Sequence, residues 1–411
     1  MKIITNGDKK VIDFNQLIKD KPLLMVLILS LVVRIVFMWI YPDQNFPDSM
    51  AYKTIGQEIF SGQIITNNTY MPLYPIWSYL TGGGSIQILM DIFISVASVW
   101  LVFSLSLLLF ENRFSALLSS AISALYPHFL FYSVSGLTEV FYTFLLLFSF
   151  LLFYRKKFII AIIISVIAIL VRPTLDFLNP ILIVLFVGFV HSSGWRSVVK
   201  YLGIYFITYV VLLSPWWMHQ YQKYGEFIRL NLADGIVLYS GNNPLNKTGG
   251  GIVGTDVDMS SFDNEKNPVI RNNKMKTAAI EYIVSNPGHF IELAGLKFSR
   301  FWRLWPHTQH YQQWYVVAAS LLSYGVILFL AIGFVFRNAG MYLRRIAPIF
   351  VLFGYLTLVH MVTIGSIRYR FPLEPFLIIF SGYFFVDILK KYKLLNCVKN
   401  KKSYNSHHKP Y

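Results

Sequence analysis

Residues 84–110 of the chain read GSIQILMDIFISVASVWLVFSLSLLLF, and Asp91 is the only charged side chain in this stretch. A helix needs about 20 predominantly apolar residues to cross the hydrocarbon core of a bilayer, so the stretch predicts a membrane span. The whole chain of 411 residues agrees, because 55% of its residues are hydrophobic and only 14% are charged. Soluble domains carry roughly 25% charged residues. The sequence therefore indicates an integral membrane protein and excludes cytosolic enzymes and disordered scaffolds.

The same criterion, applied outward from this stretch, predicts an all-α polytopic membrane protein with about ten transmembrane helices. The expected spans are 22–41, 84–110, 114–132, 137–154, 158–171, 176–190, 198–217, 312–336, 346–365 and 371–389. The apolar run that begins at Pro22 is too long for a cleavable signal peptide and lacks a small-residue cleavage site. Cys397 is the only cysteine, which excludes an internal disulfide framework and a cysteine-rich metal site.

The basic residues gather on one side of these spans. The segments on the side of the N-terminus hold most of the lysines and arginines, whereas the opposite side is balanced in sign, so the formal net charge of +16 lies on one face. The positive-inside rule places this face, and both termini, in the cytoplasm. We expect the cell membrane, with the endoplasmic reticulum as the alternative. Topology and attraction to anionic lipids account for the basic charge, and no nucleic-acid partner is expected.

These spans divide the chain into a cytoplasmic N-terminal tail (1–21), a transmembrane domain (22–392) and a basic cytoplasmic C-terminal tail (393–411). Two outer loops, 42–83 and 218–311, are long. Apolar residues at helical spacing predict amphipathic helices in these loops near 47–62, 268–284 and 286–305. Pro47 and the pair Asn286-Pro287 suit helix starts, and Gly62 suits a helix end.

The motifs in these loops and at the outer ends of the spans, taken in order, resemble the GT-C superfamily of polyprenyl-phosphate-dependent glycosyltransferases. By pattern, the chain is most similar to the protein O-mannosyltransferases and the lipid A aminoarabinose transferases. The resemblance extends from Pro22 to Leu389. The motifs that carry it are Pro47-Asp48-Ser49-x-x-Tyr52, Pro72-x-Tyr74-Pro75, Glu139, Arg172-Pro173, Asn286-Pro287, Phe301-Trp302 and Arg368-Tyr369-Arg370-Phe371-Pro372.

The resemblance implies that Asp48 is the general base that deprotonates an acceptor hydroxyl, with Asp43 as the second candidate. A general base must lie within hydrogen-bonding reach of that proton. Without the resemblance, an aspartate at this position is as readily explained by a helix start. Many members carry two adjacent acids here, whereas this chain has Asp48 followed by Ser49, so a mechanism that needs both acids is not expected.

The remaining substrate-binding candidates are Tyr52, Glu139, Arg172, Arg368 and Arg370. Arginine forks match phosphate oxygens, and a cation must offset the charge of a departing lipid phosphate. The alternative is that the arginines anchor in the head-group region. Glu139 either orients substrate, binds a metal together with Asp48, or caps its helix.

The resemblance also implies the partners of the reaction. The donor would be a polyprenyl-phosphate-linked sugar and the acceptor a glycan, lipid or protein of the cell envelope. A divalent metal is a possible cofactor, although no ligand cluster has diagnostic spacing.

Two charged residues fall inside predicted spans. Arg34 and Asp91 lie at similar depth from the outer ends of their helices, and charges within a membrane are usually paired. We therefore expect a salt bridge or a shared polar pocket. In the second loop, Asn242-Asn243-Pro244 is interpreted either as a turn that covers the site or as an ordinary turn.

Other functions remain open at this point. A flippase or transporter of lipid-linked sugars would place polar residues through the bilayer midplane, and this chain has few. A glycan ligase or polymerase typically has a basic outer loop, whereas the second loop here is mixed in sign. A structural membrane protein is the third alternative.

Overall fold

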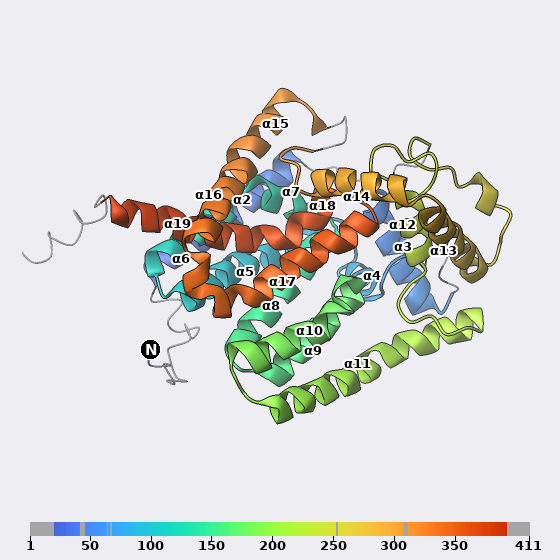
Figure 1. Ribbon diagram of the computed structural model, residues 1–411, viewed down its shortest axis with the longest axis horizontal. Helices are drawn as coiled ribbons and strands as arrows, with labels where there is room; N and C mark the ends of the chain where they lie inside the picture. The colour runs from blue at the N-terminus through green and yellow to red at the C-terminus, as the bar shows by residue number, and fades with distance from the viewer. Residues whose placement is uncertain are drawn as a thin grey trace, which may run out of the picture.

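The computed structural model describes residues 20–41, 46–63, 65, 68–251, 254–306 and 311–392, and within these ranges every regular element is a helix. The predicted all-helical class is confirmed for this part of the chain. Figure 1 shows the helices in chain order. The first half contains α2 (Lys21–Ile40), α3 (Pro47–Ser61), α4 (Leu73–Leu80), α5 (Gly84–Phe110), α6 (Arg113–Leu125), α7 (Pro127–Ser133), α8 (Thr138–Tyr154) and α9 (Phe158–Val171).

The second half continues through a short 3₁₀ turn, η1 (Pro173–Leu175), and includes two π-helical segments, η2 (Val184–Val190) and η5 (Leu321–Gly325). Its helices are α10 (Leu178–Ile183), α11 (Trp195–Tyr224), α12 (Asp234–Gly241), α13 (Pro268–Ser285), α14 (Pro287–Phe301), α15 (Trp314–Ser320), α16 (Val326–Arg337), α17 (Ala339–Val362), α18 (Ile367–Arg370) and α19 (Glu374–Lys391). Two further 3₁₀ turns are η3 (Ser260–Phe262) and η6 (Phe371–Leu373).

Six helical stretches of the described chain are long and apolar enough to cross a membrane. They are Lys21–Ile40, Gly84–Phe110, Trp195–Tyr224, Trp314–Arg337, Ala339–Val362 and Ile367–Lys391. The pair α6 and α7, bent by 54° at Tyr126, makes a seventh if it is counted as one span. Three other predicted spans form shorter apolar helices, Thr138–Tyr154, Phe158–Val171 and Leu178–Val190. The predicted count of ten is therefore not confirmed, because these three are shorter than a lone span requires.

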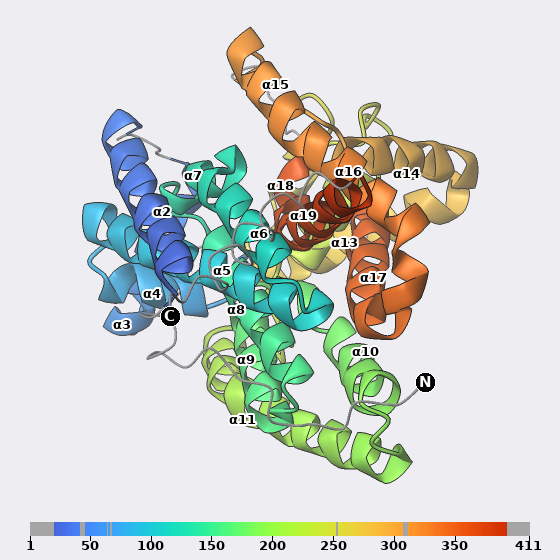
Figure 2. The same cartoon turned by 90° about the vertical axis from the view of Figure 1, so that its left-hand side faces the viewer.

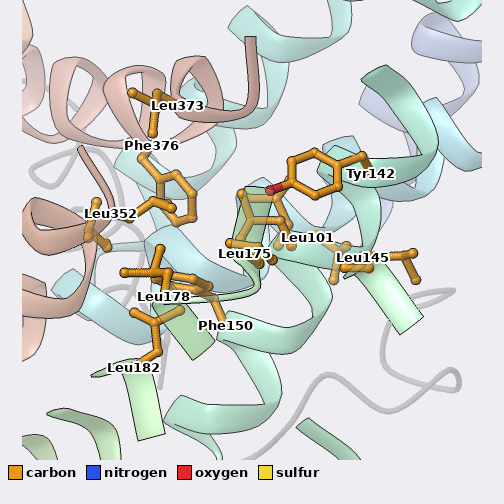
Figure 3. Close-up of a cluster of buried hydrophobic side chains, with 14 of the residues drawn as sticks. Leu101, Tyr142, Leu145, Phe150, Leu175, Leu178, Leu182, Leu352, Leu373 and Phe376 are labelled. Carbon is orange, nitrogen blue, oxygen red and sulfur yellow. The ribbon is translucent and has the colours of Figure 1, made fainter. Parts of the chain in front are cut away.

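The short helices are the interior of the bundle. α8 packs between α5 and α9, and most of its residues are buried by protein rather than exposed to lipid. Figure 3 shows the cluster in which α8 meets α5, α10, α17 and α19. Phe150 of α8 lies with its ring 5.4 Å from Phe186 and 5.1 Å from Phe376. Lipid is as apolar as these side chains, so close packing rather than escape from water holds the helices together. This packing fixes the ends of α8, α9 and α19.

The two long loops, 42–83 and 218–311, form a polar end of the molecule. Helices α3, α12, α13 and α14 gather at the right in Figure 1, far from the C-terminal end of α19 at the left. α11 runs along one edge of the bundle in Figure 2 and packs mainly on α9, α10 and η2. The three predicted amphipathic helices are confirmed as α3, α13 and α14, although α14 ends at Phe301 rather than Trp305. Gly62 ends α3 in the left-handed conformation, at φ 69°.

The prediction that α14 begins at Asn286-Pro287 is confirmed, because Asn286 occupies the N-cap position and Pro287 is the first helical residue, but Asn286 does not use its side chain as a cap. Its side chain makes no capping bond to α14 and instead donates to the Tyr282 carbonyl at the end of α13, at 3.1 Å. The side chain that caps a helix in this region is Asn267, which accepts from the amides of Val269 and Ile270. Asn286 therefore lies at the junction of the two helices: its side chain bonds to the end of α13, and its carbonyl accepts from the Phe290 amide of α14 at 3.0 Å.

The predicted pair of Arg34 and Asp91 is also wrong. Arg34 donates to Ser95, one turn along α5 from Asp91, and to the carbonyls of Ser123 and Ala124. These carbonyls lie just before the break at Pro127, whose missing N–H leaves Ser123 without its helical partner. The fully buried Arg34 guanidinium thus supplies donors to backbone carbonyls at the break between α6 and α7.

Asp91 has partners of its own. It accepts from the Tyr74 hydroxyl at 2.7 Å and the Trp77 indole at 3.0 Å, both on α4. These bonds tie the loop helix α4 to the membrane helix α5.

Candidate functional site

Four charged side chains from distant parts of the sequence meet at the polar end of the bundle. Asp48 lies in the first turn of α3, Glu139 in the first turn of α8, Arg172 directly after α9, and Arg368 in α18. Arg368 donates from Nη1 to Asp48 Oδ2 at 2.6 Å and from Nε to Glu139. Arg172 donates from Nη2 to Glu139 Oε1 at 2.5 Å. We call these four residues the charged cluster. The structure thus brings together four of the six candidates.

Asp48 is the carboxylate of the cluster that combines access to solvent with strong hydrogen bonding. Its side chain is 26% exposed, and Oδ1 accepts from the Tyr70 hydroxyl at 2.7 Å. Burial alone would raise the pKa of this carboxyl, but Arg368, Tyr70 and Arg172 outweigh burial and lower it below its ordinary value. Asp48 is therefore an ionised carboxylate at neutral pH, which is the state a general base requires.

Glu139 is the buried centre of the cluster. Its carboxylate is fully buried and contacts both guanidinium groups, while Arg172 also donates from Nε to Thr138 Oγ1 at 2.7 Å. A buried carboxylate is tolerated when it is paired and hydrogen-bonded in this way. Of the three roles considered from sequence, a helix cap is not supported. The residue that precedes α8 makes no side-chain capping bond, and the only amide of α8 that bonds to the Glu139 carboxylate is that of Glu139 itself. Glu139 instead fixes the two arginines.

Two tyrosines line the side of Asp48. Tyr52, one turn after Asp48 on α3, is 2% exposed, and its ring centre lies 4.9 Å from that of Tyr70 and 5.0 Å from that of Tyr74. Sequence analysis selected Tyr52 but missed Tyr70. The chain contains 26 tyrosines, and nothing in the spacing of Tyr70 from Asp48 distinguishes it from the others. The Tyr52 ring thus packs against Tyr70, and the Tyr70 hydroxyl donates to Asp48.

Arg370 lies outside the charged cluster. It is fully buried and donates from Nε to Glu374 at 3.0 Å, and from Nη1 to the Phe301 carbonyl at 3.0 Å and to the Arg303 carbonyl at 2.7 Å. Glu374 is shared with His128, whose Nδ1 lies 3.0 Å from it. These carbonyls belong to the end of α14, where a cation is favoured by the helix dipole. Arg370 therefore ties the segment that carries Arg368 to α14.

α14 holds the same segment at a second place. The Lys297 ammonium, which is fully buried, donates to the Val362 carbonyl at 3.1 Å and to Asn242 Oδ1 at 2.8 Å. Arg300 donates to the Gly365 carbonyl at 3.2 Å. A Cβ on Gly365 would lie 2.4 Å from the Lys297 carbonyl, so only glycine permits this close approach of the two backbones. The connection between α17 and α18 is thus clamped against an outer-loop helix, which positions Arg368.

The Asn242-Asn243-Pro244 segment belongs to this clamp and is an ordinary packed turn rather than a mobile cover. Asn242 and Asn243 are at most 1% exposed, and the Asn242 amide donates to the carbonyls of Leu238 and Val362, each at 2.9 Å.

A divalent metal does not fit the charged cluster as the residues stand. Two carboxylates are present, but the Arg368 guanidinium lies between them and contacts both. Within the described residues, no group of three or more histidine, cysteine, aspartate or glutamate side chains could hold a metal ion. Asp43, the second candidate base, lies outside the described residues.

Comparison with known proteins identifies the fold. No protein-family model and no curated protein matches the sequence. Among solved structures, the chain is similar to the oligosaccharyltransferase of Archaeoglobus fulgidus in its apo form, with a TM-score of 0.55 and 12% identity over 94% of this chain and 52% of that one. It is also similar to the A. fulgidus oligosaccharyltransferase AglB in complex with an inhibitory peptide and a dolichol-phosphate, with a TM-score of 0.54 and 14% identity over 96% of this chain and 53% of that one.

A third structure, the A. fulgidus enzyme in complex with Zn and sulfate, has a TM-score of 0.54 and 13% identity over 91% of this chain and 50% of that one. The chain therefore shares the fold of these solved oligosaccharyltransferase structures. It spans about half the length of the solved structures it matches. At these identities the likeness shows the fold alone, so the narrower resemblance to mannosyltransferases and aminoarabinose transferases stays a prediction.

Proposed function

We propose that the protein is a membrane glycosyltransferase that moves a sugar from a polyprenyl-phosphate donor to a hydroxyl group on the outer or lumenal face. The observation that carries the proposal is the charged cluster at the polar end of a GT-C fold. An ionised, partly exposed carboxylate lies against a guanidinium that can also contact phosphate. Transfer from such a donor needs a base for the acceptor proton and a cation for the leaving phosphate.

In the proposed reaction, Asp48 accepts the proton of the acceptor hydroxyl. The acceptor oxygen forms a bond to the anomeric carbon, and the bond from that carbon to the phosphate oxygen breaks. The bonding electron pair leaves with the polyprenyl phosphate, and a single displacement inverts the anomeric centre. The same role of one carboxylate as base is found in inverting glycoside hydrolysis.

The charges of the cluster link the two halves of this step. Asp48 and Glu139 balance Arg172 and Arg368, so the cluster is neutral at rest. Protonation of Asp48 removes the anion that holds Arg368 Nη1, at the moment when the phosphate gains negative charge. The freed guanidinium then faces the leaving group, where positive charge lowers the barrier. Glu139 retains Arg172 and keeps Arg368 from moving away.

The other candidates have supporting roles in this proposal. Tyr52 forms the packed floor beneath Asp48 and Tyr70, and Arg370 positions Arg368 through α14 rather than binding phosphate itself. The transmembrane domain is proposed to extend over 22–392, with outer loops 42–83 and 218–311, and the tails 1–21 and 393–411 are placed in the cytoplasm. The cell membrane is the proposed location. The acceptor is proposed to be a glycan, lipid or protein.

The experiment supplies purified protein with radiolabelled polyprenyl-phosphate sugars, both hexoses and pentoses, and with lipid-linked oligosaccharides. A membrane extract provides acceptors. Label transferred from a monosaccharide donor supports the proposal, and the labelled product identifies the acceptor class. Transfer from oligosaccharide donors alone would instead support the glycan ligase alternative or an oligosaccharyltransferase, the class named for the matched structures. Movement of donors across reconstituted vesicles without transfer would support a flippase and contradict the proposal.

A further inference from the structure

We propose that Arg368 is the resident cation of the site, occupying the place between Asp48 and Glu139 that a divalent metal would take, and that transfer proceeds without a bound divalent metal. The inference deepens the proposed function and rests on it for the role of Asp48. Its argument comes from the contacts and charges of the cluster. One matched structure is a complex with Zn, which makes the question specific to this fold.

The Arg368 guanidinium lies between the two carboxylates. Nη1 donates to Asp48 Oδ2 at 2.6 Å, while Nε and Nη2 face the two oxygens of Glu139, with Nη2 at 3.4 Å from Oε2. A metal shared by both carboxylates would need their oxygens at about 2.0–2.6 Å. The Arg368 nitrogens already lie in contact with those oxygens, so a metal can enter only if Arg368 leaves.

Charge also opposes metal binding at the cluster. A metal commonly joins two carboxylates because it neutralises them, but here Arg172 and Arg368 already do so. A dication added to the neutral cluster would face two guanidinium groups at close range and would be repelled by both. Arginine cannot lose its proton to relieve this repulsion.

Arg368 is also held in place. Lys297, Arg300 and Arg370 fix the backbone on both sides of it to α14, through bonds to the Val362, Gly365 and Phe301 carbonyls. Removal of Arg368 by a competing ion would leave Glu139 fully buried with Arg172 as its remaining cation. The clamp therefore favours the guanidinium over an ion that enters from solvent.

The first test measures the wild-type protein. Manganese binding is followed by electron paramagnetic resonance without any donor, and sugar transfer is measured after exhaustive chelation. We expect no stoichiometric manganese site and at least nine-tenths of the transfer rate. Loss of transfer on chelation with recovery on added manganese would overturn the inference, as would a manganese site that disappears in Asp48→Asn. Because manganese binding needs no donor, failure of the inference is distinguishable from failure of the proposed function.

The second test uses two variants with the same net charge. Arg368→Gln removes the guanidinium between the carboxylates, whereas Arg172→Gln leaves it there. We expect Arg368→Gln to gain manganese affinity by at least 10-fold and Arg172→Gln to gain none. An equal gain in both, or no gain in either, would overturn the claim that Arg368 occupies the cation position. Gel filtration and thermal melting confirm that each variant is folded. If Arg368→Gln is unstable, Arg368→Met, which also removes the cation, replaces it and is compared with Arg172→Met.

Discussion

Replacement of Tyr70 by phenylalanine tests how the site sets the state of its base. The Tyr70 hydroxyl donates to Asp48 Oδ1 at 2.7 Å, and Arg368 remains on the other oxygen after the replacement. A hydrogen bond to a charged group contributes about 1.5–3 kcal/mol. Since the Asp48 side chain is 26% exposed, water partly replaces the lost donor, and the low end of that range applies. At 1.36 kcal/mol per unit, the pKa of Asp48 should rise by about 1 unit.

The direction of the effect follows from the loss of a donor to the ionised form. A carboxylate with fewer donors is protonated at higher pH, so the base is lost earlier as the pH falls. The acidic limb of kcat/KM against pH should move up by about 1 unit, while the rate well above that limb changes little. Initial rates of sugar transfer at low donor concentration, measured across the acidic and neutral range, give this profile.

The control is Tyr79→Phe, on the neighbouring helix α4. The Tyr79 side chain is 40% exposed and stacks on Phe60 rather than contacting the charged cluster. Its profile should match that of the wild type. An unchanged limb in Tyr70→Phe, or a shift to lower pH, would refute the reasoning. A shift of equal size in the Tyr79 control would show that the effect does not arise from the bond to Asp48.

Three further predictions concern stability in detergent, measured by thermal melting. Arg370→Met leaves Glu374 buried without its arginine and should cost about 3–5 kcal/mol, whereas Arg370→Lys should lose less; equal melting temperatures in the two variants would argue against the ion pair. Arg34→Leu leaves the Ser123 carbonyl without a donor and should cost at least about 1–3 kcal/mol; a wild-type melting temperature would contradict the role given to Arg34. Burial lowers the pKa of Lys297 to about 8 from 10.5. Between pH values of about 8 and 10.5, Lys297 is protonated in the unfolded chain but neutral in the folded one. The contribution of Lys297 to the free energy of unfolding should therefore rise with pH across this window, and Lys297→Met should lose this rise.

The sequence was sufficient to predict the fold class and to place the candidate residues at the same end of the helical bundle. Long apolar runs identify helices such as Gly84–Phe110 because a span has a required length. Short runs such as Phe158–Val171 are ambiguous, since an apolar helix enclosed by others has the same composition as a tilted span. Glu139, Arg172 and Arg368 were expected at outer helix ends, and the structure places them in one cluster with Asp48.

Helix rotation was not predictable from the sequence. Successive residues turn by about 100° around a helix, so depth alone does not fix which way a side chain points. Arg34 and Asp91 were matched in depth, yet Arg34 donates to Ser95, one turn away from Asp91, and to the Ser123 carbonyl, which Pro127 leaves without its helical partner. Arg368 and Arg370 are two positions apart and point in roughly opposite directions, which is why one joins the cluster and the other joins α14.

The clamp on α14 was also beyond sequence analysis. Lys297 and Gly365 are far apart in the chain, and no pattern shows that the two backbones touch. A lysine on an amphipathic loop helix is ordinarily solvated. Only the packed structure shows that Lys297 is buried and supports the segment of Arg368.

The most direct test of the central claim is single-turnover transfer of a sugar from a polyprenyl-phosphate donor by the wild type, Asp48→Asn and Asp43→Asn. Binding of radiolabelled donor is measured in parallel. The account predicts that Asp48→Asn binds donor normally and transfers at least about 10²-fold more slowly, the contribution expected of a general base. Asp43→Asn should retain transfer. Wild-type rates in Asp48→Asn, or loss confined to Asp43→Asn, would contradict the assignment of Asp48 as the base.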